Sequence, residues 1–576
     1  MGATSLLLLS PSLFLLRARE VGALKGGLVD PSLVTPVLLL NALSLAAIFG
    51  VARRAWLGGL FLLPLLLWLP AEWFYLWKFG GPTTAQSFGV LAETDPAEAM
   101  SWLGCTGTAV LAMCGVWLGA LGFGISRLRR SGLAWRHWTA PLFGLLMPLL
   151  IAGAVVWSNA SLAKEEIDFS GGDAGWLGVL DENRAGWTET LAMSYPLGMV
   201  VRLHDYWQQT RLLADVSRRA VREPFGARQS LASAQRQVFV FVVGESLRAD
   251  HLELNGYGRQ TTPRLARRDV ISFKDYVSVS SSTRVSVPTY FTRQYADRLE
   301  LEPGQPSLLD GLHEAGFRTY WLSTQAPFGR FDSPVAVVAQ RADDVRFVNP
   351  GDYRQRGLYD AQLLEPLAQV LARKEKRTFI VLHTLGAHAD YRYRYPEEAA
   401  HFVPVLGAGR MSDPWDPRQR KYQVNAYDNA VLYMDSFLDE LIAQLEAEDA
   451  QTWLFYASDH GETLFDGQCR QAGHGFPSAA NHRAAVLFWS SKAYGASHGA
   501  ALERLRSHAE LSSDYRAIMP TLLDLAGVSS ARIAAGESLA SVDYRPPEVR
   551  RVRPGGAMGV IDFDRQMGGV DCANGH

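Results

Sequence analysis

Charged residues are distributed very unevenly along this chain of 576 residues. Residues 1–157 contain 16 Asp, Glu, Lys and Arg residues, and residues 158–576 contain the other 98. A transmembrane helix needs roughly 20 apolar residues, and four stretches of the first part are near that length. They run over 32–52, 55–77, 104–125 and 138–157, and a shorter fifth stretch covers Ser5–Leu16. We therefore expect a membrane domain of four or five helices at residues 1–157.

The charges of the loops between these stretches orient the expected membrane domain. Cytoplasmic loops carry an excess of Lys and Arg. The loops at 53–54 and 126–137 are basic, whereas the loop at 78–103 carries three acidic residues against one Lys. We therefore expect everything after Trp157 to lie outside the cytoplasm. The basic residues at 17–25 would oppose this orientation if the short first stretch spans the membrane.

Two further features belong to the membrane domain and the segment after it. Glu72 lies at the outer edge of the 55–77 stretch. A carboxylate inside a membrane span is a functional candidate, but so close to the interface an ordinary solvated carboxylate is an equal alternative. Residues 158–235 form a connector, in which Tyr195–Val216 has apolar residues at helical spacing. Such an amphipathic helix either lies on the membrane surface or packs as an ordinary helix. The net charge of −2 for the whole chain argues against binding of nucleic acid, which needs a basic face.

Residues 236–576 alternate between apolar β-rich runs and helix-like stretches. This alternation predicts an α/β domain with a mainly parallel central sheet and helices on both faces. The expected strands are Val238–Val243, Thr319–Ser323, Phe379–His383, Trp453–Ala457 and Ala485–Trp489. The expected helices are Ser307–Ala315, Ala361–Ala372, Tyr427–Ala447 and Tyr515–Ala526. Functional sites of such folds collect at the carboxyl ends of the strands.

Several polar residues follow the expected strands at that edge. Glu245 comes directly after the first strand, and Asp459 and His460 stand in tandem after the fourth. Carboxylates and imidazoles are ligands that zinc accepts. A run of hydroxyl residues surrounds Thr283, and His474 lies between two glycines. Each feature alone is weak, but their joint occurrence at the strand ends of one domain predicts a site.

Seven segments carry recognisable motifs. They are V-G-E-[ST]-x-R at Val242–Arg248, N-G-Y-x-R-x-T-T-P at Asn255–Pro263, T-x-x-S-[VL]-P at Thr283–Pro288, H-x-x-G-x-H at His383–His388, Y-D-N at Tyr427–Asn429, S-D-H-G-E at Ser458–Glu462 and H-G at His474–Gly475. Together they resemble the lipid phosphoethanolamine transferases of the Gram-negative inner membrane, within the alkaline phosphatase/sulfatase superfamily. The likeness spans nearly the whole chain, and it implies that the Y-D-N segment starts a helix.

The resemblance implies a zinc-dependent active site. The residues that would hold zinc, with Thr283 also the nucleophile, are Glu245, Thr283, Asp459 and His460. The residues that would contact the phosphoryl group, a second zinc ion or the incoming acceptor are His388 and His474. The residues that match a donor-lipid motif of a periplasmic loop are Thr94 and Glu98.

The implied reaction fits the chemistry of these residues. Metal coordination activates a threonine hydroxyl, and zinc neutralises charge on phosphoryl oxygens. Attack on phosphatidylethanolamine would release diacylglycerol and leave phosphoethanolamine on Thr283. Lipopolysaccharide core, lipid A or another glycan would then accept the group, with His388 or His474 handling the proton. The implied location is the inner membrane, with the catalytic domain in the periplasm.

The chain departs from many lipid A-modifying relatives. Those relatives have a disulfide-rich periplasmic domain, whereas only Cys469 and Cys572 of the four Cys residues follow residue 157. They often read W-x-D-N where this chain has 321–325, Trp-Leu-Ser-Thr-Gln, a pattern more like members that act on lipopolysaccharide core or other glycans. Val90 stands where some relatives have Asn. The tail Arg545–Asp564 is expected to be an extended closing segment without an assigned role.

Other activities of the superfamily stay open as alternatives. A sulfatase would need Arg where this chain has Tyr290, so that activity is disfavoured. A glycerophosphate or other phosphodiester-group transferase, or a hydrolase, would use a metal site of the same kind. A non-catalytic membrane scaffold is disfavoured because the expected metal ligands and the nucleophile are all present. The acceptor, and whether Cys469 pairs with Cys572, stay undecided by the sequence.

Overall fold

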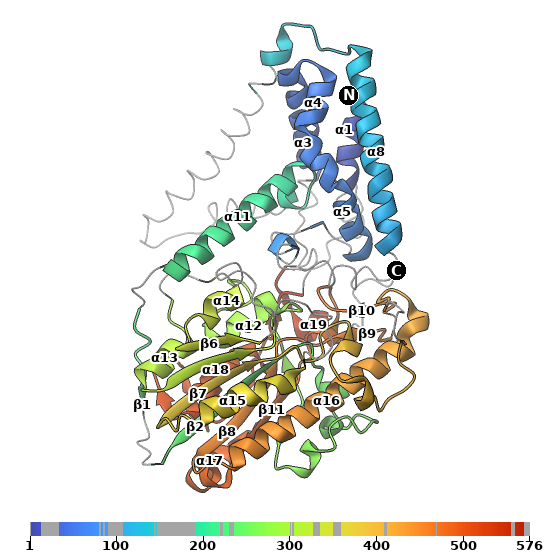
Figure 1. Ribbon diagram of the computed structural model, residues 1–576. Coiled ribbons are helices and arrows are strands. Elements are labelled where there is room, and N and C mark those ends of the chain that lie inside the picture. The colour runs from blue at the N-terminus through green and yellow to red at the C-terminus, as the bar shows by residue number, and fades with distance from the viewer. Residues whose placement is uncertain are drawn as a thin grey trace. The chain divides into compact units, whose positions relative to one another are not determined.

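The structure is a computed structural model of the chain, and its described residues form two compact units (Figure 1). The described residues are 2–12, 34–79, 82–83, 87–89, 91, 107–142, 144, 146, 190–218, 223–229, 235–299, 301, 305–325, 334–348, 359–407, 412–467, 469–554 and 559–568. Unit 1 falls within 1–88, 108–207 and 556–559, and unit 2 falls within 89–107, 208–555 and 560–576.

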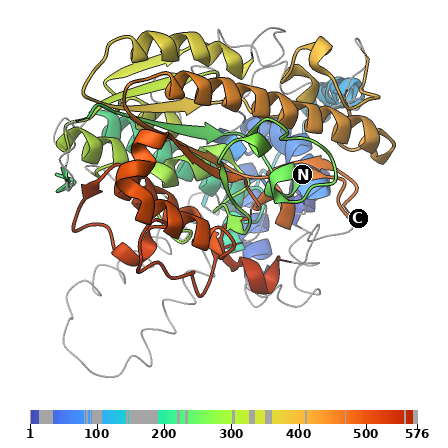
Figure 2. The same cartoon turned by 90° about the horizontal axis from the view of Figure 1, so that it is seen from below.

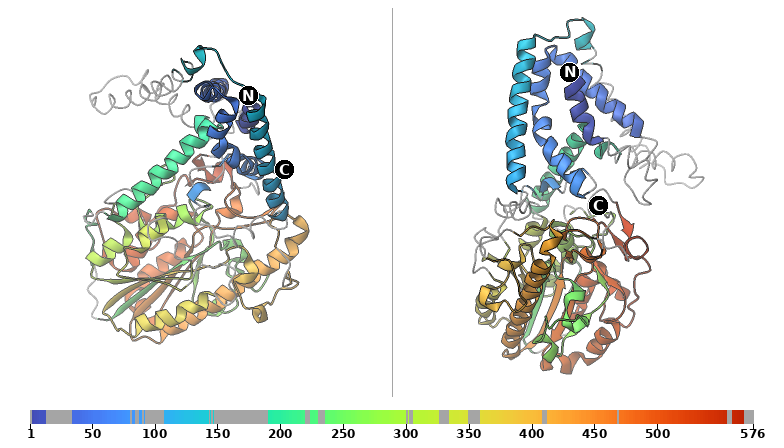
Figure 3. Two further views of the ribbon diagram at one scale, coloured as in Figure 1. Left: turned by 45° about the horizontal axis from the view of Figure 1, so that its top comes forward. Right: turned by 90° about the vertical axis from the view of Figure 1, so that its right-hand side faces the viewer.

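Unit 1 is helical. Its helices are α1 Gly2–Leu9, α3 Val34–Ala52, α4 Ala55–Phe61, α5 Leu63–Phe79, α8 Gly107–Ser131 and the first residues of α11 Leu197–Arg218. Among the described residues, α3 is the one unbroken helix that is long and apolar enough to cross a membrane. The pair α4 and 63–76 of α5 also meets that test but bends by 57° at its break. Trp117 Nε1 of α8 donates to Leu66 O of α5 at 2.8 Å, which ties these helices together. Figure 3 shows the helices of unit 1 in two further ribbon views.

These helices match the expected apolar stretches in part. The described parts of the stretches at 32–52, 55–77 and 104–125 are helical, although the second is broken in two. The short first stretch begins as the eight-residue helix α1 and a 3-10 turn at Ser10–Ser12. Most of the last stretch lies outside the described residues. The number of membrane spans therefore stays a prediction.

The expected connector helix is present as α11. It covers Leu197–Arg218, close to the expected bounds of 195–216. Side chains of earlier helices anchor its start: Leu197 N donates to Asn41 Oδ1 at 2.8 Å, and Ser12 Oγ donates to Tyr195 O at 2.8 Å. The bond to Leu197 N satisfies one of the N–H groups that a helix start leaves unpaired.

Unit 2 is built around a seven-stranded sheet of order β3-β11-β8-β2-β7-β5-β6. The strands are β3 Ile271–Phe273, β11 Val486–Ser490, β8 Gln451–Ser458, β2 Gln237–Gly244, β7 Arg377–His383, β5 Arg318–Ser323 and β6 Asp344–Phe347. The strands from β8 to β6 are parallel, whereas β11 runs antiparallel to both of its neighbours. The expected mainly parallel sheet is confirmed.

Short two-stranded pairs surround the central sheet. They are β1 Arg228–Gln229 with β13 Val528–Ser529, β4 Tyr276–Val277 with β12 Ser513–Asp514, β9 Thr463–Leu464 with β10 Ala472–Gly473, and β14 Arg551–Val552 with β15 Ile561–Asp562. The pair β14 and β15 lies in the tail, which ends its described part in α19 Phe563–Gln566.

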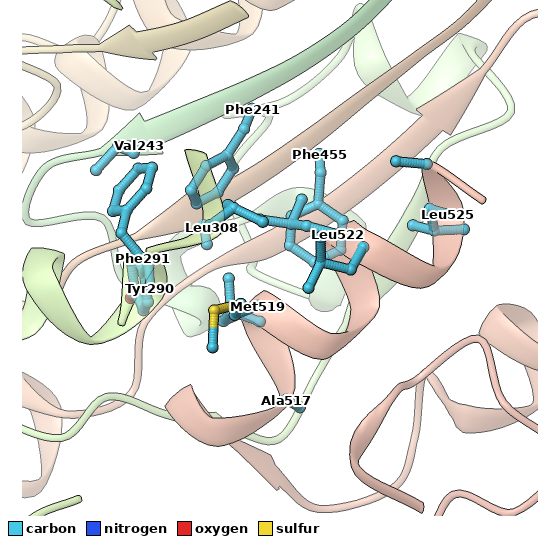
Figure 4. Packing of buried hydrophobic residues seen from close by; sticks show 14 of the residues in the cluster. Phe241, Val243, Tyr290, Phe291, Leu308, Phe455, Ala517, Met519, Leu522 and Leu525 are labelled. Carbon is cyan, nitrogen blue, oxygen red and sulfur yellow. The ribbon is translucent and has the colours of Figure 1, made fainter. Parts of the chain in front are cut away.

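Helices cover both faces of the sheet (Figure 2). Those on one face are α15 Leu364–Leu371 and α16 Arg420–Glu446. Those on the other face are α12 Thr283–Phe291, α13 Leu308–Glu314, α14 Pro334–Ala339, α17 Lys492–His508 and α18 Ile518–Leu525. All eight residues of β2 are buried, because this central strand has a hydrophobic layer on each side. Figure 4 shows one layer, in which Phe241 and Phe455 pack near Leu522 of α18.

The Y-D-N segment does not start a helix, so this prediction was wrong. Helix α16 begins at Arg420, and Tyr427 lies two turns inside it. The start signal lies earlier, where the Asp416 side chain accepts a hydrogen bond from Arg418 N ahead of the 3-10 turn Pro417–Gln419. Such a carboxylate before Pro is a common helix start.

The Y-D-N segment instead braces the loop that follows β2. Tyr427 Oη donates to Ser246 O at 2.8 Å, and Arg248 N donates to Tyr427 Oη at 2.9 Å. Asp428 is fully buried. Its carboxylate contacts three side chains of the N-G-Y segment and the turn before it: His251 at 2.8 Å, Tyr257 at 3.0 Å and Arg259 at 2.6 Å.

Replacing Asp428 by Ala should therefore destabilise unit 2 by about 3 kcal/mol or more, because it leaves a partly buried Arg and two hydrogen-bonding groups without their acceptor. Thermal or denaturant unfolding of the full chain measures the loss. A matched control on the same helix is Asp439→Ala, whose carboxylate is partly exposed and pairs with Arg268. That control should cost less than about 1 kcal/mol, and equal losses in the two variants would contradict the bracing role.

Candidate active site

The two acidic residues of the site come from neighbouring parallel strands. Gly244 of β2 pairs with Ser458 of β8, so the next residues, Glu245 and Asp459, leave the sheet side by side at the carboxyl edge. Ser246 N donates to Asp459 Oδ1 at 3.0 Å, which holds the two loops together. Glu245 and Asp459 are both buried. The structure therefore brings Glu245 and Asp459 together at this edge of the sheet.

Thr283 is the first residue of helix α12, after Ser282 as N-cap. Its hydroxyl donates to Glu245 Oε2 at 3.0 Å and lies 3.4 Å from His460 Nε2. His460 Nε2 in turn lies 3.5 Å from Glu245 Oε1 and 3.3 Å from Asp459 Oδ2. The chain thus brings together all four residues that were expected to hold zinc.

This cluster fits a divalent cation on chemical grounds. One ligand atom from each of Glu245, Asp459 and His460 lies within 4.8 Å of the others. Asp459 Oδ2 is buried and accepts no hydrogen bond from the described residues. Burial, and then the charge of Asp459, raise the pKa of Glu245 well above its usual range. Burial also lowers the pKa of His460 to about 3, which leaves its imidazole neutral and able to bind a metal.

A second group of side chains adjoins the first. His460, Glu462 and His474 also offer ligand atoms within 4.8 Å of one another. His474 Nδ1 lies 2.9 Å from Glu462 Oε2, and Tyr391 Oη donates to Glu462 Oε1 at 2.8 Å. The ring of His388 lies 5.7 Å from that of His474. The ring of His474 lies 4.4 Å from that of His460, so His474 adjoins the Thr283 cluster and His388 lies beside His474.

The loop that carries His388 is held by a buried carboxylate. Asp360 accepts hydrogen bonds from Leu385 N at 2.8 Å and Gly386 N at 3.0 Å, and from Thr324 Oγ1 at 2.7 Å. Gly386 has φ of +48°, and a Cβ added there would lie 2.5 Å from Glu245 O. The glycine of H-x-x-G-x-H thus lets the His388 loop lie against the backbone of Glu245.

Replacing Gly386 by Ala should lower the stability of the folded chain by about 2 kcal/mol or more, because backbone strain and a backbone clash both oppose it. It should also reduce activity, since the clash moves Glu245 and the His388 loop apart. The control is Gly258→Ala, where an added Cβ meets nothing within 4 Å. An unfolding midpoint for Gly386→Ala equal to that of the control would contradict the close approach.

Two residues near the cluster had no assigned role. Gln325 Nε2 donates to Thr384 O at 2.9 Å and to Glu245 Oε2 at 3.3 Å, so it helps to orient the Glu245 carboxylate. Glu462 connects His474 to Tyr391. Glu462 could be found from the sequence as the last residue of S-D-H-G-E. The contact of Gln325 depends on the ends of β5 and β2 lying close in space, so no local sequence pattern indicates it.

Tyr290 occupies the position where a sulfatase would need Arg. Its side chain is buried, and its hydroxyl donates to Ser458 O at 2.6 Å and accepts a hydrogen bond from Tyr276 at 3.0 Å. Tyr290 therefore ties α12 to the end of β8 and presents no cation to a sulfate. This placement agrees with the sequence argument against a sulfatase activity.

The tail braces the segment that precedes Thr283. Arg553 N donates to Val279 O at 2.7 Å, and Arg553 and Ser280 form a parallel β-bridge. Ser281 Oγ donates to Pro554 O at 3.3 Å. Arg550 joins the same region through Asp275 at 2.6 Å. The tail thus contacts the segment that leads into the hydroxyl-rich run around Thr283, a role that its sequence did not indicate.

Some expected residues fall outside the described part of the chain. Thr94 and Glu98, the candidates for the donor lipid, are among them. Cys469 forms a disulfide, and Cys572 also lies outside the described residues.

Comparisons with known proteins agree with this geometry. The profile of the sulfatase family matches residues 237–528, slightly more than half of the chain. Phosphoethanolamine transferase EptA of Salmonella typhimurium is 26% identical over 516 residues, which cover 86% of this chain and 87% of that protein. Phosphatidylethanolamine transferase Mcr-1 of Escherichia coli is 32% identical over 312 residues, covering 52% of this chain and 55% of that protein.

Solved structures extend the likeness to the fold. The integral membrane protein lipooligosaccharide phosphoethanolamine transferase A from Neisseria meningitidis matches with a TM-score of 0.64 and 22% identity, over 94% of this chain and 98% of that one. The C-terminal periplasmic domain of EptC from Escherichia coli, in complex with Zn, matches with a TM-score of 0.54 and 25% identity, over 60% of this chain and 97% of that one. The chain therefore belongs to the sulfatase family, and its relatives within that family are phosphoethanolamine transferases.

Proposed function

We propose that the chain transfers phosphoethanolamine from phosphatidylethanolamine to an acceptor of the bacterial envelope, through a covalent intermediate on Thr283. The observation that carries this proposal is the Thr283 hydroxyl, which lies at a helix start within 3.0 Å of Glu245 and 3.4 Å of His460. The activity of the named relatives supports the same transferred group.

One zinc ion, or two, would serve this reaction. Glu245, Thr283, Asp459 and His460 would hold the first ion, and the zinc complex of the EptC domain supports its identity. When bound, zinc supplies Lewis acidity and lowers the pKa of a coordinated hydroxyl. His460, Glu462 and His474 are the residues that would hold a second ion.

In the first step, Thr283 Oγ1 attacks phosphorus. The new Oγ1–P bond forms as the bond from phosphorus to the diacylglycerol oxygen breaks, and diacylglycerol leaves with a proton. Glu245 Oε2 is the nearest acceptor for the hydroxyl proton of Thr283. Thr283 is the first residue of α12, and the partial positive charge of a helix N-terminus favours an anionic phosphoryl group there.

In the second step, the acceptor displaces Thr283 from phosphorus. Its hydroxyl or phosphate oxygen forms the new bond to phosphorus, and the Oγ1–P bond breaks as Thr283 Oγ1 regains a proton. For a hydroxyl acceptor, this proton balances the one that the acceptor loses. His388 and His474 lie beside the cluster and are the groups suited to take the proton of an acceptor hydroxyl. Lipopolysaccharide core, lipid A and other envelope glycans are the acceptor classes that fit.

The test is mass spectrometry of lipid A, lipopolysaccharide core and other envelope glycans from cells with and without the chain. We expect one of these molecules to gain phosphoethanolamine only when the chain is present. A gain of glycerophosphate would instead assign the chain to the alternative transferase activity. No gain on any envelope molecule would count against the transferase proposal.

We further propose that the chain resides in the inner membrane of a Gram-negative bacterium, with residues 236–576 in the periplasm. The N-terminal apolar helix α3 and the integral membrane relative support this location. A reporter that is active only in the periplasm should be active when fused after Trp157. Activity of a cytoplasm-only reporter at that position would overturn the orientation.

A further inference from the structure

A short hairpin of unit 2 carries His474 into the site (Figure 1). Its strands β9 and β10 pair antiparallel, with Thr463 opposite Gly473, so the residues that flank the pair, Glu462 and His474, lie together. His474 Nδ1 is 2.9 Å from Glu462 Oε2, and the ring of His474 is 4.4 Å from that of His460. The position of His474 therefore depends on how this hairpin is held.

A buried guanidinium holds the base of the hairpin. Arg248 is 5% exposed, and its Nη1 donates to Glu462 O at 3.1 Å and to Asp466 Oδ2 at 2.7 Å. The same oxygen of Asp466 accepts a hydrogen bond from Leu464 N at 2.8 Å. On its other side, Arg248 donates from Nε and Nη2 to the two oxygens of Asp250 at 2.8 Å and 2.6 Å. Arg248 thus joins the loop after β2 to the hairpin.

Neutralising Arg248 does not by itself account for Asp466. Asp250 already pairs with two N–H groups of Arg248 in a bidentate arrangement, so a second carboxylate is not needed to balance the charge. The residue before Asp466 has an unusual backbone, because Phe465 has φ of +59° and a buried side chain. A non-glycine residue in this region costs free energy and persists where its surroundings fix it, often at functional sites. The contacts of Asp466 help to fix this turn.

The groups that serve the first step are placed without the hairpin. Thr283 begins α12, and its hydroxyl contacts Glu245 and His460. Those two residues follow the ends of β2 and β8, which pair directly in the central sheet. A hairpin that is held less firmly should therefore disturb His474 more than the nucleophile.

The second step is the one that uses His474. When Nδ1 donates to Glu462, Nε2 is the nitrogen that can accept a proton. We propose that Arg248 and Asp466 are positioning residues, which hold His474 so that Nε2 takes the proton of an acceptor hydroxyl. The acceptor O–H bond breaks as its oxygen bonds to phosphorus, and Thr283 Oγ1 leaves phosphorus and regains a proton. This inference rests on the proposed function.

The test compares Asp466→Ala with Asp250→Ala, because each variant removes one of the two carboxylates that pair with Arg248. The full chain is produced in cells and purified in mild detergent. Peptide mass spectrometry gives the fraction of chains with phosphoethanolamine on residue 283, and mass spectrometry of the envelope of the same cells gives the transferred product.

Asp466→Ala should lower the product about tenfold or more and raise the fraction of chains with the adduct, because the adduct still forms but is consumed slowly. Asp250 is half exposed and lies outside the hairpin. Asp250→Ala should therefore keep both quantities within about twofold of the parent.

Two further variants separate positioning from loss of the fold. His474→Ala should also accumulate the adduct, and adding Asp466→Ala to it should cost no further product, because a residue that acts through His474 then has nothing to position. Asp466→Asn keeps an oxygen for Arg248 and Leu464 N but loses the charge. Its adduct fraction should lie between those of the parent and Asp466→Ala.

Equal losses of product in Asp466→Ala and Asp250→Ala, or a further loss in the double variant, would assign the network to stability alone and overturn the inference. An adduct fraction in Asp466→Ala no higher than in the parent would overturn it as well. If the parent and Thr283→Ala leave the same envelope, the proposed reaction itself fails. If they differ while Asp466→Ala matches the parent, this inference fails alone.

Discussion

Thr283→Ala should abolish transfer while leaving the chain folded and in the membrane. The expected loss is about 10³-fold or more, because the variant removes the atom that forms the covalent bond to phosphorus. The side chain is partly exposed, and its hydroxyl bonds only to groups of the site, so its loss should cost little stability. Mass spectrometry of the envelope acceptor measures transfer, and the unfolding temperature reports on the fold.

Two variants separate the nucleophile from its surroundings. Thr283→Ser keeps a hydroxyl on the same helix turn and should retain measurable transfer with a covalent phosphoethanolamine adduct on residue 283. Thr289→Val removes a hydroxyl from the same helix, where it donates to Ser286 O at 2.6 Å, and should retain transfer. Full activity in Thr283→Ala would exclude the covalent intermediate, and equal losses in Thr283→Ala and Thr289→Val would assign both effects to folding.

The sequence was sufficient to predict the parts of the fold that depend on local patterns. The run of Val and Phe in β2 alternates between the two hydrophobic layers, and this alternation is visible without coordinates. Glu245 and Asp459 could be placed together because parallel strands bring their carboxyl ends to one edge. The start of α16 was missed because Asp416 and Pro417 lie outside the hydrophobic pattern. The break between α4 and α5 was missed because the sequence is apolar on both sides of it.

The contacts that the sequence did not reveal all join residues far apart in the chain. Gln325 reaches Glu245 across 80 positions, and the tail reaches the hydroxyl loop across 273. Contacts of this kind produce neither a periodic pattern nor a motif in the sequence of either segment. Arg202 was inside the expected amphipathic helix, yet helical spacing shows only that a residue shares a face, and its pairing with Glu72 depends on how two helices pack.

Asp459→Asn should remove zinc from the site and reduce transfer by about 10²-fold or more, because it neutralises one of the two buried carboxylates that would balance the charge of the ion. In the presence of a chelator, the same variant should be more stable than the parent above neutral pH. Folding raises the pKa of both Asp459 and Glu245, chiefly through burial. The folded parent then binds more protons than the unfolded chain, so its stability without metal falls as pH rises through the raised pKa values. The Asn variant has one fewer buried carboxylate to ionise, so its stability falls less as pH rises.

In the presence of zinc, the parent should instead be more stable than Asp459→Asn. Binding to the folded state alone raises the unfolding temperature of the parent, and the Asn variant should show little rise at the same zinc concentration. The control is Asp435→Asn, a fully buried carboxylate on α16 that accepts hydrogen bonds from Arg264 N and Leu265 N through separate oxygens. The amide oxygen keeps one of these bonds, so the control should lose some stability at every zinc concentration. It should keep both its zinc content and its response to zinc. If Asp459→Asn binds zinc as the parent does, Asp459 is not a zinc ligand. If this variant is also less stable than the parent in the presence of a chelator, hydrogen bonds rather than a metal hold Glu245 and Asp459 together.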